Sequence, residues 1–117
     1  MRLIKSFGYA FRGIYLLIKS EKNFQIHVVA LCVVVAAGIY FDIHRAEWAL
    51  ILLISGMVLG FEAMNSSLEK LCNEVTNERK ETIRNIKDIA AGGVLVNAII
   101  ALIIAGIIFG NRIIQLF

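Results

Sequence analysis

Apolar positions along the chain gather in three long blocks that are separated by short polar segments. The blocks cover residues 27–41, 48–61 and 89–111, and none of them carries a formal charge when His27 is neutral. A helix needs about 20 apolar residues to cross a bilayer. The third block meets this length by itself, and the first two meet it when their helices continue into flanking residues.

The blocks therefore predict three transmembrane helices, at about residues 24–41, 48–68 and 89–110. Residues 42–47 are predicted to form a short loop between the first two, and the chain is predicted to reverse near Thr76-Asn77 before the third. A soluble helical bundle is the alternative. It would need a polar face on every helix, whereas the stretch 94–109 offers only Asn97. The hydrophobic content of 59% also favours the membrane.

Residues 2–19 follow a different pattern. Apolar residues such as Ile4, Phe7 and Phe11 recur at steps of three and four, while basic residues recur every seven positions on another face. This spacing predicts an amphipathic helix that lies in the membrane interface. The whole chain, residues 1–117, is then a single all-α integral membrane domain with one surface helix and three transmembrane helices.

Basic residues are distributed unevenly over the predicted loops. Ten of the twelve precede the first span or lie between the second and third spans. The positive-inside rule places these segments in the cytoplasm. The net charge of +3 needs no nucleic-acid partner, because an anionic leaflet accounts for it.

A stripe of polar residues interrupts the apolar character at the end of the second span. At 100° per residue, one side of a helix carries all five of its members, which are Glu62, Asn65, Ser66, Glu69 and Asn73. Ionisable residues at membrane depth are costly, and by default they indicate function. The structural alternative is that these side chains only join helices by hydrogen bonding.

Three spans in up-down-up order bring further charges to the same membrane face as the stripe. These are Glu21, Lys87 and Asp88. Carboxylates suit Mg²⁺ that is shared with phosphates, and lysine can hold phosphate charge. No Gly-rich phosphate loop is present, so a nucleotide site would not be of the P-loop type. From the residues alone, the acidic site could serve phosphoryl transfer to a lipid alcohol or cation transport.

The joint pattern of these motifs resembles the bacterial diacylglycerol kinase and undecaprenol kinase family. The resemblance covers essentially the whole chain. It is carried by Glu62-x-x-Asn65-Ser66-x-x-Glu69, Lys87-Asp88-x-Ala90-Ala91-Gly92, Ser6-Phe7-x-Tyr9-Ala10-x-x-Gly13, Glu21-x-Asn23-Phe24-x-Ile26-His27 and Glu47-Trp48.

The resemblance implies a homotrimeric lipid kinase of the bacterial inner membrane with its N-terminus and active site on the cytoplasmic side. Such an enzyme uses ATP and Mg²⁺ to phosphorylate the hydroxyl of undecaprenol or diacylglycerol. The product, undecaprenyl phosphate or phosphatidic acid, would enter envelope lipid recycling. The alternative is a non-enzymatic oligomeric scaffold or a cation-conducting membrane protein.

Roles for individual residues also come from the resemblance. Glu62 matches the catalytic base and Asn65 the amide beside it. Glu21 and Glu69 match the carboxylates that hold Mg²⁺ and ATP. The remaining expected nucleotide contacts are Arg2, Tyr9, Glu78, Arg79, Lys80, Lys87 and Asp88.

The chain departs from the family pattern at a few positions. Asn73 stands where an aspartate is common, Arg79-Lys80 where a histidine is common, and Gln25 where an arginine is common. His27 stands where the diacylglycerol kinases tend to carry a second acid. This last difference favours undecaprenol as the acceptor.

Overall fold

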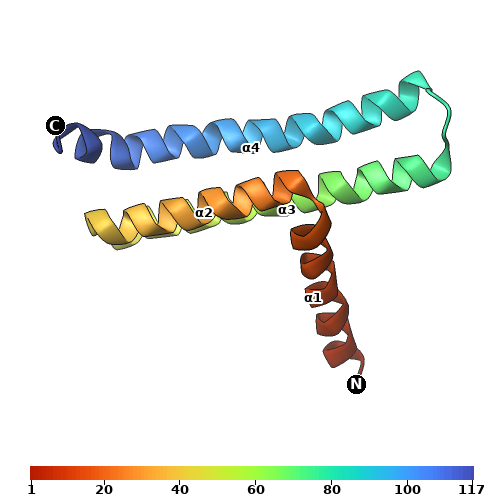
Figure 1. Cartoon of the computed structure of the whole chain (residues 1–117), viewed down its shortest axis with the longest axis horizontal. Helices are drawn as coiled ribbons and strands as arrows, with labels where there is room; N and C mark the ends of the chain where they lie inside the picture. Colours follow the sequence, from red (N-terminus) through yellow and green to blue (C-terminus); the bar gives the residue numbers. More distant parts are fainter.

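A computed structural model describes residues 1–117 as four α-helices joined by short connections (Figure 1). The helices are α1 (Arg2–Ser20), α2 (Lys22–Phe41), α3 (Arg45–Val75) and α4 (Glu81–Ile114). By length and composition, α2, α3 and α4 can each cross a membrane. This confirms the predicted all-α fold with three candidate spans. The homotrimer and the interfacial position of α1 stay predictions.

α3 is the central element, because it packs against both α2 and α4. These three helices run side by side, whereas α1 leaves the start of α2 at a steep angle (Figure 1). α3 and α4 continue past the start of α2 as a two-helix extension that ends in the loop 76–80. The polar half of α3 therefore stands beyond the region where all three helices meet.

The chain reverses at the end of this extension, where the sequence predicts it. α3 ends at Val75, next to the predicted reversal at Thr76-Asn77. The Thr76 hydroxyl oxygen accepts a hydrogen bond from the backbone N–H of Glu78 at 3.0 Å. This bond gives the turn a local partner in a segment without glycine or proline.

The opposite connection is shorter than the predicted loop of residues 42–47. It contains only residues 42–44, because α3 already begins at Arg45. The Glu47 carboxylate accepts a hydrogen bond from the backbone N–H of His44 at 2.9 Å, which satisfies a donor at the helix N-terminus. Asp42 takes a left-handed backbone conformation (φ 51°) and ends α2.

The corner between α1 and α2 consists of a single non-helical residue, Glu21. The Gln25 side-chain amide donates a hydrogen bond back to the carbonyl oxygen of Ile18 at 2.7 Å. This bond satisfies one of the carbonyls left free at the end of α1. No residue of α1 is buried.

The buried core lies near the short connection between α2 and α3. A cluster of Ile43, Ile51, Ile108 and Phe109 forms its centre. Most other large apolar side chains are exposed, and only 12 of the 117 residues are buried. Because lipid tails are as apolar as these side chains, outward faces of this kind are stable in a bilayer.

Gly38 allows α2 to approach α3 closely at this end. A Cβ atom at Gly38 would lie 2.6 Å from Cη2 of Trp48, well inside contact distance. The absence of a side chain therefore makes room for the indole ring against α2.

Gly38→Ala is expected to destabilise the protein by about 1–3 kcal/mol, the usual cost of overpacking. Thermal unfolding in detergent micelles measures this. Gly106→Ala is the matched control, because a Cβ there meets nothing within 4 Å. Equal stability of the two variants would show that the Trp48 ring does not constrain α2.

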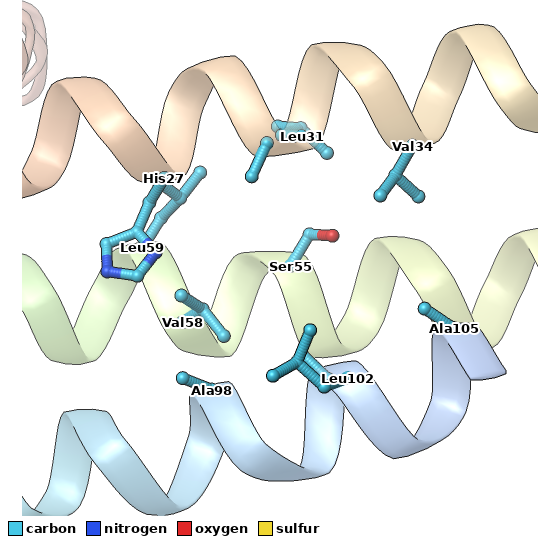
Figure 2. Close-up of a pocket in the computed structure, with 11 residues that line it drawn as sticks. His27, Leu31, Val34, Ser55, Val58, Leu59, Ala98, Leu102 and Ala105 are labelled. Atoms are coloured by element: carbon cyan, nitrogen blue, oxygen red, sulfur yellow. The ribbon is translucent and has the colours of Figure 1, made fainter.

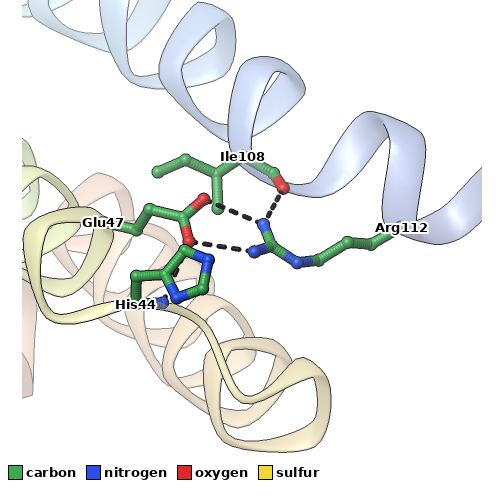
Figure 3. A network of polar contacts seen from close by, with 4 residues as sticks. All are labelled: His44, Glu47, Ile108 and Arg112. Carbon is green, nitrogen blue, oxygen red and sulfur yellow. Dashed lines mark hydrogen bonds and ion pairs between the residues drawn. The ribbon is translucent and has the colours of Figure 1, made fainter.

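An ion pair links α3 and α4 at the same end of the bundle (Figure 3). Arg112 of α4 donates two hydrogen bonds to the Glu47 carboxylate of α3, at 2.8 and 2.9 Å, and a third to the carbonyl oxygen of Ile108. Hydrogen bonds from Arg112 and from the His44 backbone lower the pKa of Glu47 to about 2. The bidentate geometry fixes the end of α4 against the start of α3.

The Glu47 carboxylate should stabilise the fold over a defined pH range. Its pKa falls from 4.5 to about 2 on folding, so its contribution is complete above pH 4.5 and is lost as the pH falls through about 2. Glu47→Gln is expected to lower the melting temperature at pH 7 by a few degrees. The difference from wild type should shrink between pH 4.5 and pH 2, and a difference that stays constant over this range would contradict the assignment.

Candidate active site

Glu62 is a buried carboxylate on α3, with 3% of its surface exposed. It lies where the apolar part of the helix gives way to the polar part. Its Oε2 atom is 3.8 Å from Nε2 of His27 on α2. The neighbouring helix thus places an imidazole beside this buried carboxylate.

The predicted polar stripe continues from Glu62 along α3. Glu62 and Ser66 are buried, Asn65 is half-buried, and Glu69 and Asn73 are exposed. Exposure therefore increases along the stripe toward the end of α3. Such a gradient is expected where α3 passes from its apolar part into its polar part.

Glu21, which lies at the corner between α1 and α2, forms an ion pair with a lysine of α3. Its carboxylate lies 3.1 Å from Nζ of Lys70. Glu21, Glu69 and His27 are all within electrostatic range of the Glu62 carboxylate. The fold thus brings Glu21, from the corner between α1 and α2, close to Glu62 and Glu69 of α3.

A polar cleft of about 820 Å³ lies on the extension formed by α3 and α4. It is lined by five of the predicted nucleotide contacts, namely Glu78, Arg79, Lys80, Lys87 and Asp88, whereas the predicted contact Glu69 does not line it. Lys87 donates a hydrogen bond to Oδ1 of Asn73 at 2.7 Å, which links the two helices. With Arg84 also in its wall, the cleft offers four basic groups to an anionic ligand.

Arg2 and Tyr9 are not brought to this cleft within one chain. Both are exposed residues of α1, which runs away from the extension (Figure 1). Their side chains have no hydrogen-bond or ion-pair partner in the chain. Their predicted contacts with nucleotide therefore stay predictions.

The predicted metal ligands are two carboxylates, Glu21 and Glu69. The chain contains no group of three or more His, Cys, Asp or Glu side chains arranged around a metal position.

Sequence reasoning missed the contact between His27 and Glu62. The two residues are far apart in sequence, and only the packing of α2 on α3 joins them. In the sequence, His27 is notable as part of a motif and as a departure from the diacylglycerol kinase pattern, but nothing there pairs it with Glu62. The one available signal was an ionisable residue at the edge of an apolar block.

Comparisons with known proteins place the chain in a family. The sequence model of the family described as "Prokaryotic diacylglycerol kinase" matches residues 8–109. The chain belongs to this family. Membership confirms the resemblance and supports a lipid kinase rather than a scaffold or a cation-conducting protein.

Relatives within the family carry two different names. An undecaprenol kinase from Bacillus subtilis is 36% identical over 108 residues, which are 92% of this chain and 88% of that protein. A diacylglycerol kinase from Synechocystis is 31% identical over 105 residues, 89% of this chain but 60% of that protein. A diacylglycerol kinase from Escherichia coli K12 is 26% identical over 102 residues, covering 87% and 84% of the two chains.

Proposed function

We propose that this family member is an ATP- and Mg²⁺-dependent lipid kinase that phosphorylates the hydroxyl of a membrane lipid alcohol. The observation that carries the proposal is the position of Glu62. Its carboxylate is buried at the end of the apolar part of α3, and the polar cleft lies further along the same helix. A lipid alcohol held in the bilayer and a nucleotide held in water can meet there.

Glu62 is proposed to act as the general base. Its carboxylate accepts the proton of the lipid hydroxyl while the hydroxyl oxygen attacks the γ-phosphorus, and ADP leaves. Asn65, about one turn further along α3, orients the hydroxyl or the carboxylate. Direct in-line transfer needs little more from the protein than positioning and charge.

The cleft on the extension is proposed to hold the phosphates of ATP. Lys87 is its best-placed cation, because the hydrogen bond that it donates to Asn73 already fixes its ammonium group. Arg79 and Lys80 add charge from the loop, while Glu78 and Asp88 border the cleft. In the proposed homotrimer, Arg2 and Tyr9 of the exposed α1 also contact ATP.

Mg²⁺ fits the donor set that the chain offers. Mg²⁺ is usually held by one or two carboxylates and completed by phosphate oxygens and water. Glu21 and Glu69 are oxygen donors of this kind, and a pair rather than a larger acidic group suits an ion shared with ATP. When bound, the ion neutralises charge on the phosphates.

Undecaprenol is the proposed acceptor, with diacylglycerol as the alternative. His27 beside Glu62 distinguishes this chain from the pattern expected of diacylglycerol kinases. The undecaprenol kinase relative also shares more of its sequence than the two diacylglycerol kinases do. The product, undecaprenyl phosphate, would serve envelope lipid recycling at the cytoplasmic side of the bacterial inner membrane.

Glu62→Gln is expected to lower kcat by about 10²–10⁴-fold, since an amide cannot accept the proton. Transfer of labelled γ-phosphate from ATP to undecaprenol and to diacylglycerol in membranes measures this. Glu74→Gln, at an exposed position of the same helix, is the control and should keep the wild-type rate. A folded Glu62→Gln protein with an unchanged rate would rule out the base assignment.

Lys87→Gln is expected to raise the KM for ATP by about 10-fold or more, because it removes a charge-assisted contact to phosphate. The KM for the lipid should not change. Lys22→Gln, which alters an exposed lysine at the start of α2, serves as the control. An effect confined to the lipid KM would place Lys87 at the acceptor instead of the nucleotide.

A further inference from the structure

Each turnover of the proposed kinase leaves one proton on the carboxylate of Glu62. The general base takes this proton from the acceptor hydroxyl, and it must lose the proton again before it can act a second time. With 3% of its surface exposed, Glu62 is poorly placed to give the proton directly to water. Repeated turnover therefore depends on a neighbouring group that can accept the proton and pass it on.

His27 is the ion-pair partner of Glu62 within the chain. Its Nε2 atom lies 3.8 Å from Oε2 of Glu62, and Figure 2 shows the imidazole reaching from α2 toward α3. The distance is longer than a hydrogen bond, but catalytic contacts are often long before the substrate binds and shorten afterwards. Imidazole is also the side chain that gains and loses a proton near neutral pH.

The surroundings of His27 give its ring access that the glutamate lacks. The side chain of the histidine is 23% exposed, against 4% for that of the glutamate. It borders an apolar groove of about 290 Å³ between α2, α3 and α4, where Ser55 is the only other polar lining residue. This space leaves room for the ring to turn. His27 also lies six residues, or about 9 Å of helix, from the non-helical residue at the corner between α1 and α2. The exposed Lys22 and Asn23 lie between them, so the way from the ring to water along α2 is short.

The other polar groups near Glu62 are less suited to carry the proton. Glu21 and Glu69 are within electrostatic range, but under the proposed function they hold Mg²⁺, and a metal ligand has to stay deprotonated. The one buried polar residue of α4 is Asn97, whose side-chain amide donates a hydrogen bond to the carbonyl oxygen of Gly93 at 3.1 Å. An amide is no proton carrier at neutral pH.

We propose that His27 is a proton relay that returns Glu62 to its ionised state after each phosphoryl transfer. The inference rests on the proposed kinase function and adds a step to it. In this step, the O–H bond of the Glu62 carboxyl group breaks and an N–H bond forms at Nε2 of the neutral imidazole. The imidazolium then gives one proton to water, which restores both side chains. His27 acts through Glu62 and does not touch the acceptor.

The relay separates the first turnover from all later ones. Glu62 is ionised when the reaction starts, so the first phosphoryl group is transferred without help from His27. Without the imidazole, the protonated carboxyl group then has to lose its proton directly to water, and the second turnover is delayed. A histidine that only joined the helices, or only aimed the carboxylate, would affect the first turnover as well.

Rapid-quench measurements with γ-labelled ATP test the relay in His27→Gln. They use the full chain in detergent micelles and the better of the two acceptors, undecaprenol and dioleoylglycerol. We expect one lipid phosphate per active site to form at the wild-type rate. The steady-state rate should then be about 10²-fold below wild type, at the lower end of the range for a positioned proton-transfer group. His44→Gln changes the other histidine of the chain, at the opposite end of the bundle, and should match wild type in both phases.

Free imidazole provides a second measurement. His27→Ala removes the ring and leaves a space that opens to the groove, into which a free imidazole fits. Added imidazole should raise the steady-state rate of this variant toward the wild-type value and should not change the rate of the wild-type protein. A small base in solution cannot repair a misfolded protein. Rescue therefore distinguishes the relay from a structural role, and it keeps the test open should the glutamine variant fail to fold.

Three results would overturn the inference. They are an unchanged steady-state rate in the folded His27 variants, an equal loss in the first turnover and in the steady state, and no rescue of His27→Ala by imidazole. Failure of the kinase proposal is seen separately, because Glu62→Gln would then keep a wild-type first turnover. Failure of the relay alone leaves the loss in Glu62→Gln intact and changes only the His27 results.

Discussion

The site depends on α3 crossing the boundary between apolar and polar surroundings as one unbroken helix of 31 residues. Its first half packs into the core through Ile51, and its middle lines an apolar groove between α2, α3 and α4. Glu62 follows directly. Its last turns carry the polar stripe and one wall of the cleft. Because a single helix holds all of these positions, the depth of Glu62 and the reach of the cleft are fixed relative to each other.

The two ends of the bundle are held with different strength. At the short connection, the bidentate Glu47–Arg112 pair and the close contact of Gly38 with Trp48 join all three spans. Toward the polar extension, the links are single contacts, from the exposed Lys70 to Glu21 and from the half-buried Lys87 to Asn73. Exposed ion pairs contribute little stability. The polar extension is therefore held less firmly than the end at the short connection.

The pattern of apolar and polar residues was enough to predict the helical architecture. The three charge-free blocks gave the three spans, and the polar stretch after Glu69 gave the reversal near Thr76. The early start of α3 was not predicted, because it depends on the Glu47 side chain capping His44. A local pattern of charges does not reveal which side chain will meet a backbone donor.

The candidate site was predictable only in part for the same reason. The stripe on α3 followed from helical spacing, and its gradient of exposure agrees with that prediction. The contacts of Glu62 with His27 and of Glu47 with Arg112 join residues 35 and 65 positions apart. Such pairs arise from the packing of helices. The apolar groove between α2, α3 and α4 was not predicted either. Alanines in an apolar block indicate close helix packing, and only the positions of the neighbouring helices reveal a groove beside them.

The hydrogen bond from Gln25 to Ile18 has a consequence for the bend between α1 and α2. An uncharged amide holds the last turn of α1. Dissolved ions screen charged contacts strongly and neutral ones hardly at all. The hydrogen bond of Gln25 should therefore hold at any salt concentration, whereas the ion pair of Glu21 with Lys70 at the same corner should weaken as the salt concentration rises.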